Sequence, residues 1–64
     1  MKNNSYEIKY NYAGTITSEY EYSKFGALHN YMHKIIEKDF NICELKIFKN
    51  GTDITPQVNK FLYR

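Results

Sequence analysis

Alternating hydrophobic and polar residues predict that the chain begins with a β-hairpin. Tyr6, Ile8 and Tyr10 alternate with polar residues, and the alternation resumes after Ala13-Gly14 and continues to residue 22. A two-residue period in tyrosine and isoleucine is typical of strands that bury one face. We therefore predict two antiparallel strands that are joined near Ala13-Gly14.

The register of this hairpin follows from the requirement that both hydrophobic faces agree. A two-residue loop at Ala13-Gly14 would pair Tyr10 with Thr17 and set hydrophobic positions against polar ones. A three-residue loop over 12–14 pairs Tyr10 with Ile16 instead, and Gly14 then takes the position that needs a positive φ. We predict the three-residue loop. The polar face then carries the glutamates of the hairpin: Glu7, Glu19 and Glu21.

A helical period replaces the strand period over residues 24–39. Hydrophobic side chains recur there at intervals of three and four residues and form one stripe. Ser23 stands at the position of an N-cap. The stripe consists of Phe25, Leu28, Met32, Ile35 and Ile36.

The second half of the chain predicts another hairpin and a short helix. Residues 42–49 form a strand, Asn50-Gly51 is typical of a type I′ turn, and residues 52–54 form a short fourth strand. Thr55 then caps a last helix that has Pro56 at its first position.

Together these elements predict one α+β domain over residues 1–64, with 1–4 disordered. The fold is a two-layer ββαββα domain in which one long helix packs on a three- to four-stranded sheet. A right-handed crossover would lay the strand 42–49 parallel to the first strand, an outline that resembles a small β-grasp arrangement. On strict alternation, Cys43 is a small buried side chain. The predicted core is Tyr6, Ile8, Tyr10, Ile16, Tyr20, Phe25, Leu28, Met32, Ile35, Ile36, Leu45, Ile47, Ile54, Val58, Phe61 and Leu62.

Composition narrows the origin and the compartment. Lys, Asn, Ile, Tyr and Phe make up 33 of the 64 residues, and their AT-rich codons indicate a low-GC genome, such as that of a bacterium, its phages or its mobile elements. No segment approaches the ~20 hydrophobic residues of a membrane span. The N-terminus lacks the hydrophobic core of a signal peptide. A single free cysteine fits a reducing compartment, so we expect a cytoplasmic protein without membrane contact.

The residues with chemical potential do not combine into a catalytic pattern. His29 and His33 share a helix face, but the glutamate of a zinc-protease motif is absent between them. Cys43 has neither a neighbouring cation nor a helix N-terminus to activate it. We therefore expect no enzyme, no catalytic or metal-binding residues and no cofactor.

A binding function remains. With seven tyrosines and a net charge of +2, we predict a small non-enzymatic protein-binding module, an accessory protein of a phage or mobile element that modulates or inhibits a host protein. A homodimer is a further way to enlarge a small core. The predicted contacts are Glu7, Glu19, Glu21, Tyr22, Tyr31, Phe48 and Tyr63. The alternative is weak nucleic-acid binding through Lys34, Lys38, Lys46, Lys49 and Lys60.

Overall fold

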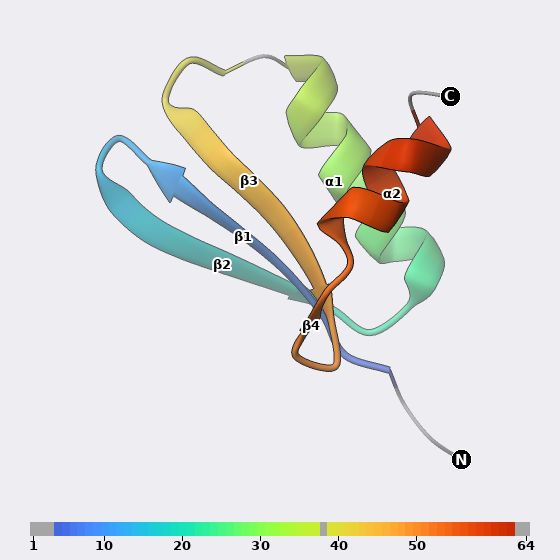
Figure 1. Cartoon of the computed structure of the whole chain (residues 1–64). Helices are drawn as coiled ribbons and strands as arrows, with labels where there is room; N and C mark the ends of the chain where they lie inside the picture. Colours follow the sequence, from blue (N-terminus) through green and yellow to red (C-terminus); the bar gives the residue numbers. More distant parts are fainter. Residues whose placement is uncertain (1–3, 38, 63–64) are drawn as a thin grey trace.

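The computed structural model describes residues 4–37 and 39–62 and confirms an α+β domain. A four-stranded antiparallel sheet has the order β2-β1-β3-β4, and both helices pack on the same face of it (Figure 1). Among the described residues, no helix combines the length and hydrophobicity that crossing a membrane requires. The elements are β1 (Tyr6–Tyr12), β2 (Thr15–Glu21), α1 (Lys24–Glu37), β3 (Ile42–Lys49), β4 (Thr52–Asp53) and α2 (Thr55–Leu62).

Strand β3 pairs with β1, but it runs antiparallel to it and not parallel as predicted. Glu7 faces Phe48, and Lys9 faces Lys46. The predicted parallel direction is wrong because the crossover helix α1 starts from β2 and not from β1. It therefore returns the chain so that β3 runs in the direction of β2, with β1 between them.

The first hairpin turns through two residues and not through the predicted three. Ala13 and Gly14 have φ values of 50° and 90°, which is a type I′ turn, and Tyr12 faces Thr15. The twist of such a turn matches the twist of the flanking strands. Asn11 strengthens it, since its Oδ1 accepts a hydrogen bond of 2.8 Å from the Gly14 N–H. Turn geometry therefore decides the register here against the hydrophobic pattern.

This register exchanges the two faces of β2. Ile16 and Tyr20 were predicted in the core, but they are 62% and 58% exposed on the face away from the helices. We call this side of the sheet the uncovered face. Thr17 and Glu19 turn toward the helices instead, because side chains alternate along a strand.

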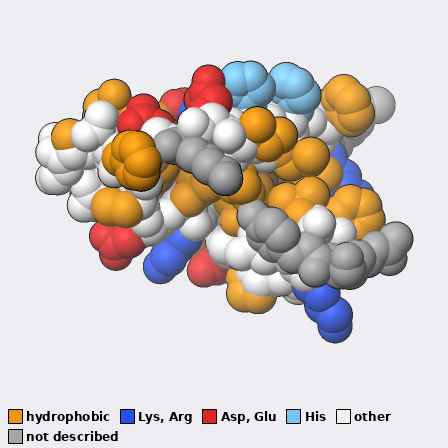
Figure 2. All heavy atoms as spheres, turned by 90° about the horizontal axis from the view of Figure 1, so that it is seen from above, with side chains coloured by type: hydrophobic (Ala, Val, Ile, Leu, Met, Phe, Trp, Pro, Cys, Tyr) orange, Lys and Arg blue, Asp and Glu red, His pale blue; other side chains and the backbone are white. Residues whose placement is uncertain are grey.

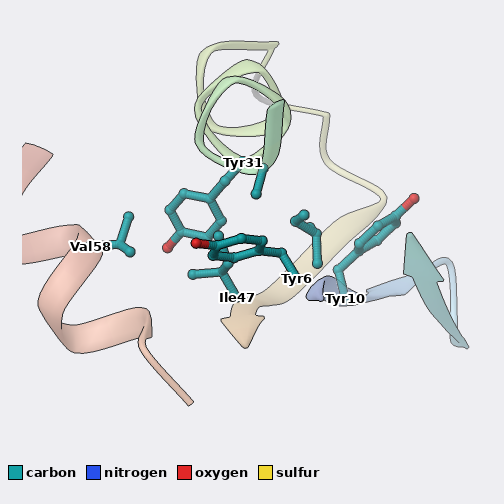
Figure 3. Packing of buried hydrophobic residues seen from close by; sticks show 7 residues of the cluster. Tyr6, Tyr10, Tyr31, Ile47 and Val58 are labelled. Atoms are coloured by element: carbon teal, nitrogen blue, oxygen red, sulfur yellow. The ribbon is translucent and has the colours of Figure 1, made fainter. Parts of the chain in front are cut away.

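The core lies between the sheet and the two helices (Figure 3). Tyr31 was predicted outside the core, yet it is 2% exposed, and its hydroxyl donates a 2.6 Å hydrogen bond to Asn59 Oδ1 on α2. Helix α1 thus presents Ala27 and Tyr31 to the sheet, about one position away from the predicted stripe. The buried cluster is Tyr6, Ile8, Tyr10, Ala27, Tyr31, Ile47 and Val58. Partly buried around it are Leu28, Ile35, Ile42, Leu45, Ile54 and Leu62. Predicted for the core but exposed are Ile16, Tyr20, Phe25, Met32, Ile36 and Phe61.

A β-bulge in β3 brings Cys43 to the surface. The pairing with β1 shifts between Lys9 and Asn11, and Glu44 has a φ of 57°. One extra residue puts the alternation on its two sides out of phase. Cys43 therefore faces Asn11 on the uncovered face and is exposed, which corrects its predicted burial.

The helix starts follow the predictions in one case and not in the other. Ser23 Oγ accepts a 3.0 Å hydrogen bond from the Gly26 N–H and caps α1 as predicted. At α2, Asp53 accepts from the Thr55 N–H at 2.9 Å, so Asp53 takes the role predicted for Thr55. The Thr55 hydroxyl instead accepts from the Ile47 N–H at 2.9 Å, which attaches α2 to the core strand β3.

Candidate binding surfaces

A hollow of the described surface opens between the two helices. It encloses about 300 Å³ against the side chain of Tyr6 and is lined mainly by Leu28 on α1, Ile54 before α2, and Val58 and Phe61 on α2. A second hollow of about 160 Å³ continues along the helices. It is lined by Met32, Ile35, Ile36 and Leu62. We call the two hollows together the interhelix groove.

The groove exists because α1 carries more hydrophobic residues than the sheet can cover. Ala27 and Tyr31 face the sheet, so the predicted stripe is turned toward α2 and solvent. Helix α2 has only eight residues, too few to cover that stripe. Phe25 and Ile36 therefore remain 85% and 70% exposed. Hydrophobic side chains gather beside the two histidines in Figure 2, and contiguous patches of this kind mark binding sites more often than isolated surface residues do.

The rim of the interhelix groove is positively charged. Lys24 from α1 and Lys49 from β3 both line the larger hollow. Neither lysine forms an ion pair with any of the described residues. The groove therefore combines a hydrophobic floor with two available cations.

The uncovered face of the sheet is a second, more polar surface. A shallow hollow of about 140 Å³ is lined there by Lys9, Ile16, Lys46 and Phe48, among others. Glu7 lies close by, and its Oε2 accepts a 2.8 Å hydrogen bond from Ser18. Charges of both signs alternate with hydrophobic side chains on this face, so it is neither predominantly charged with one sign nor predominantly hydrophobic.

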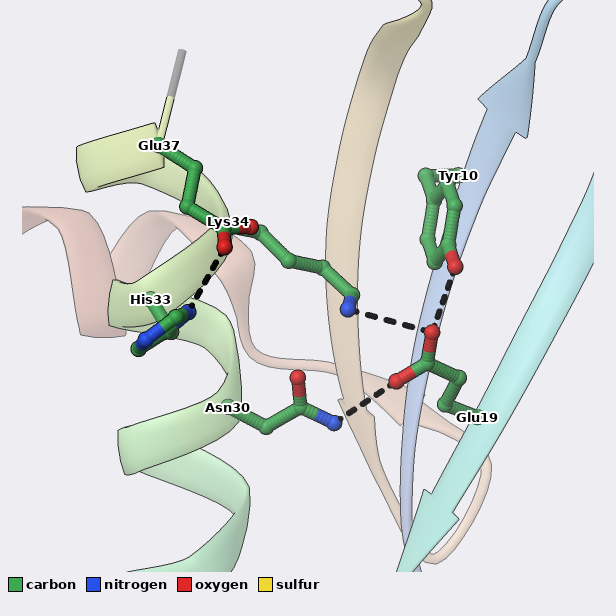
Figure 4. A network of polar contacts seen from close by, with 6 residues as sticks. All are labelled: Tyr10, Glu19, Asn30, His33, Lys34 and Glu37. Carbon is green, nitrogen blue, oxygen red and sulfur yellow. Dashed lines mark hydrogen bonds and ion pairs between the residues drawn. The ribbon is translucent and has the colours of Figure 1, made fainter. Parts of the chain in front are cut away.

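A polar cluster joins β2 to α1 (Figure 4). The Tyr10 hydroxyl donates a 2.5 Å hydrogen bond to Glu19 Oε2, and Lys34 Nζ lies 3.1 Å from the same oxygen. Asn30 donates to the other carboxylate oxygen at 2.9 Å. The Lys34 amino group also lies 5.1 Å from the centre of the Tyr10 ring. We call these four residues the Glu19 cluster.

The ionisation of the Glu19 cluster follows from these contacts. Burial is the largest single influence on the Glu19 carboxyl and raises its pKa. The hydrogen bonds from Tyr10, Asn30 and Lys34 and the charge of Lys34 together outweigh burial, so the net pKa of Glu19 is lowered. The hydrogen bond to Glu19, followed by burial, raises the pKa of Tyr10 to about 12. The cluster thus holds a carboxylate beside a protonated phenol, an arrangement that stabilises the fold.

The residues predicted as protein contacts do not form one surface. Glu7 and Phe48 lie on the uncovered face, whereas Glu19 belongs to the cluster above. Glu21 packs beside Gly26, where an added Cβ would meet its Oε1 at 3.1 Å. Tyr22 is exposed and Tyr31 is buried. Tyr63 lies outside the described residues.

The lysines of the nucleic-acid alternative are also dispersed. Lys34 is bound to Glu19, Lys46 is on the uncovered face and Lys49 is on the groove rim. Lys60 is exposed on α2, and Lys38 lies outside the described residues. Sequence reasoning missed the groove itself, because it assigned the hydrophobic stripe of α1 wholly to the core.

The two histidines lie together on α1. Their ring centres are 6.0 Å apart, and His33 Nδ1 lies 3.4 Å from Glu37 Oε2 (Figure 4). Within residues 4–37 and 39–62, no three His, Cys, Asp or Glu side chains group closely enough to hold a metal ion. Comparison with known protein families, with curated proteins and with solved structures gives no match to this chain.

Proposed function

We propose that this protein is a non-enzymatic binding module that holds a short amphipathic segment of another protein in its interhelix groove. The observation that carries the proposal is the hydrophobic hollow between α1 and α2, with Lys24 and Lys49 on its rim. In keeping with the low-GC composition, we infer a phage or mobile-element accessory protein whose partner is a host protein that it modulates or inhibits.

The shape of the groove supports a helical partner segment. Its two hollows follow one another along the helices, as the anchor side chains of a bound amphipathic helix do at spacings of three, four and seven residues. Preformed hydrophobic pockets of this kind hold the anchor residues that supply most of the binding energy.

The charge of the rim supports an acidic partner. Lys24 and Lys49 would face carboxylates that flank the hydrophobic anchors, and such complementarity raises the association rate and selects the partner. Of the lysines of the nucleic-acid alternative, the four within the described residues lie on α1, β3 and α2, and Lys34 is engaged by Glu19. This dispersal favours a protein partner over a nucleic acid.

A pair of designed peptides tests the proposal. Both carry the same hydrophobic spacing, and one has acidic flanks whereas the other has basic flanks. We expect the acidic peptide to bind with a dissociation constant at least about tenfold lower than that of the basic peptide, as measured by fluorescence anisotropy. Added salt should reduce this difference.

Matched variants locate the binding site. Ile36→Asp places a charge in the groove and is expected to weaken binding of the acidic peptide at least tenfold, or about 1.4 kcal/mol. Tyr22→Asp is the control, because Tyr22 is 72% exposed outside the groove, and it is expected to leave binding unchanged. Equal losses in both variants would contradict the proposal. Salt-dependent retardation of DNA or RNA by the native chain would favour the nucleic-acid alternative.

A further inference from the structure

The outer edge of β2 is long and pairs with no other described segment. The sheet order puts β2 at one edge and the two-residue strand β4 at the other. Strand β2 has seven residues. Proteins commonly protect such edges with prolines, lysines, bulges or short strands. Over Thr15–Glu21, β2 has no proline, lysine or bulge, and no other described segment pairs with its outer side. Its two charged side chains are Glu19, which is bound to Lys34 on α1, and Glu21.

The first hairpin determines which backbone groups point outward from this edge. A two-residue type I′ turn makes Tyr12 and Thr15 a hydrogen-bonded pair. Hydrogen-bonded and non-bonded pairs alternate along antiparallel strands. The N–H and C=O groups of Ile16, Ser18 and Tyr20 therefore point away from β1 and toward solvent.

We propose that a second copy of this chain occupies the edge, so that two β2 strands pair antiparallel about a two-fold axis at Ser18. Ser18 is the midpoint of Thr15–Glu21, so this register uses the whole strand. It also brings outward-pointing groups of one copy opposite outward-pointing groups of the other. The two four-stranded sheets then become one continuous sheet, with the helices of both copies on the same side.

The side chains of β2 are complementary to themselves in this register. The facing pairs are Ser18 with Ser18, Ile16 with Tyr20, Thr17 with Glu19, and Thr15 with Glu21. Each glutamate therefore faces a threonine, and each exposed isoleucine gains an aromatic neighbour. An axis at Glu19 would set two carboxylates against each other, which is destabilising. An axis at Thr17 would leave Tyr20 and Glu21 beyond the partner strand.

The expected association is weak and can be measured. Seven residues from each copy are fewer than the ~20–30 of a standard interface. We therefore expect a dissociation constant in the range of about 10 µM to 1 mM. Sedimentation analysis should show the 7.7 kDa monomer converting to a species of twice that mass as concentration rises. A monomer at all concentrations up to about 1 mM overturns the proposal.

Two variants at Ser18 test the backbone pairing. Ser18→Pro removes an N–H that points outward and leaves the bonds to β1 in place, and edge strands tolerate proline at such positions. We expect it to raise the dissociation constant at least about tenfold. Ser18→Ala is the matched control, because it removes the hydroxyl that donates to Glu7 but keeps the N–H, and we expect an unchanged dimer.

A cross-linking experiment tests the register without relying on a proline. In a Cys43→Ser background, Ser18→Cys places two thiols opposite each other, and the ~5.5 Å between Cα atoms of such a pair suits a disulfide. Thr17→Cys is the control, because its thiol would face Glu19 of the second copy. We expect oxidation to link S18C and not T17C. Equal linking of both, or a dimer that survives Ser18→Pro, overturns the proposal. The groove variant Ile36→Asp should leave dimerisation unchanged, which separates this result from that of the proposed function.

Discussion

The two hairpins of this small sheet have the same turn but bury their strands differently. Ala13-Gly14 and Asn50-Gly51 are both two-residue turns with positive φ at each residue. In the second hairpin the register keeps Ile47 in the core, whereas in the first it turns Ile16 to solvent. The comparison teaches that turn geometry can determine strand register even where hydrophobic side chains are exposed as a result.

The helix surface that faces each strand explains why Ile16 can be exposed while Ile47 is buried. Over β1 and β3, the helices contribute Tyr31 and Val58 to the buried cluster, and these side chains pack against hydrophobic residues of the sheet. Toward β2, α1 presents Asn30 and Lys34, whose side-chain N–H groups need a hydrogen-bond acceptor. Glu19 supplies that acceptor, whereas a hydrophobic residue in its place would leave these polar groups without a partner.

The largest expected effect on stability comes from replacing the two isoleucines that this comparison contrasts. Ile47→Ala removes a fully buried side chain and is expected to lower the free energy of unfolding by about 2–5 kcal/mol. Ile16→Ala, on the uncovered face, is expected to change it by no more than about 0.5 kcal/mol. Urea unfolding measures both values. Similar losses in the two variants would show that Ile16 is buried and that the predicted three-residue loop was right.

Periodicity was sufficient to predict the elements of the fold. It identified the strands, both helices and the Ser23 cap, because each depends on residues close together in sequence. It failed where a single residue changes the alternation. The extra residue at Glu44 exposes Cys43, and the two-residue loop at Ala13-Gly14 exposes Ile16.

The candidate site was harder to predict than the fold, for a related reason. The hydrophobic stripe of α1 was recognised, but periodicity does not show how far a short α2 covers it. Tyr31 lies beside the stripe and is buried in the core cluster, where its hydroxyl donates a hydrogen bond to Asn59 on α2. Contacts between residues so distant in sequence leave no local pattern.

A smaller effect on stability is expected from removing the charge of Glu19, which connects β2 to α1. Glu19→Gln keeps the shape of the side chain but weakens the contacts with Lys34 and Tyr10. Because Glu19 is partly exposed, we expect a loss of only about 1 kcal/mol in the free energy of unfolding at neutral pH. A stability unchanged at low salt would show that the Glu19 cluster does not stabilise the fold.

The pH dependence of stability tests the same cluster without a change of shape. The pKa of Glu19 is lowered from an ordinary value of 4.5, so its stabilisation is present above that pH and is lost as pH falls below it. The pKa of Tyr10 is raised from 10.0 to about 12, so its stabilisation is present below pH 10 and is lost as pH rises toward 12. Thermal melting across pH should show a shallower acid slope in Glu19→Gln and a shallower alkaline slope in Tyr10→Phe.

The smallest expected effect on stability comes from substitutions that give the two turns the same first residue. Ala13 adopts a φ of 50°, which asparagine accepts more readily than alanine, whereas Asn50 already has the favoured side chain at a φ of 51°. Ala13→Asn should therefore raise the free energy of unfolding by about 0.5 kcal/mol, and Asn50→Ala should lower it by at least as much. The change in Asn50→Ala is the larger of the two because Asn50 Oδ1 also accepts a hydrogen bond from the Ser5 N–H. Urea midpoints at constant m-value measure both changes. A destabilising Ala13→Asn would mean that the first turn does not hold residue 13 at positive φ, and the register of β2 would then have to follow the hydrophobic pattern after all.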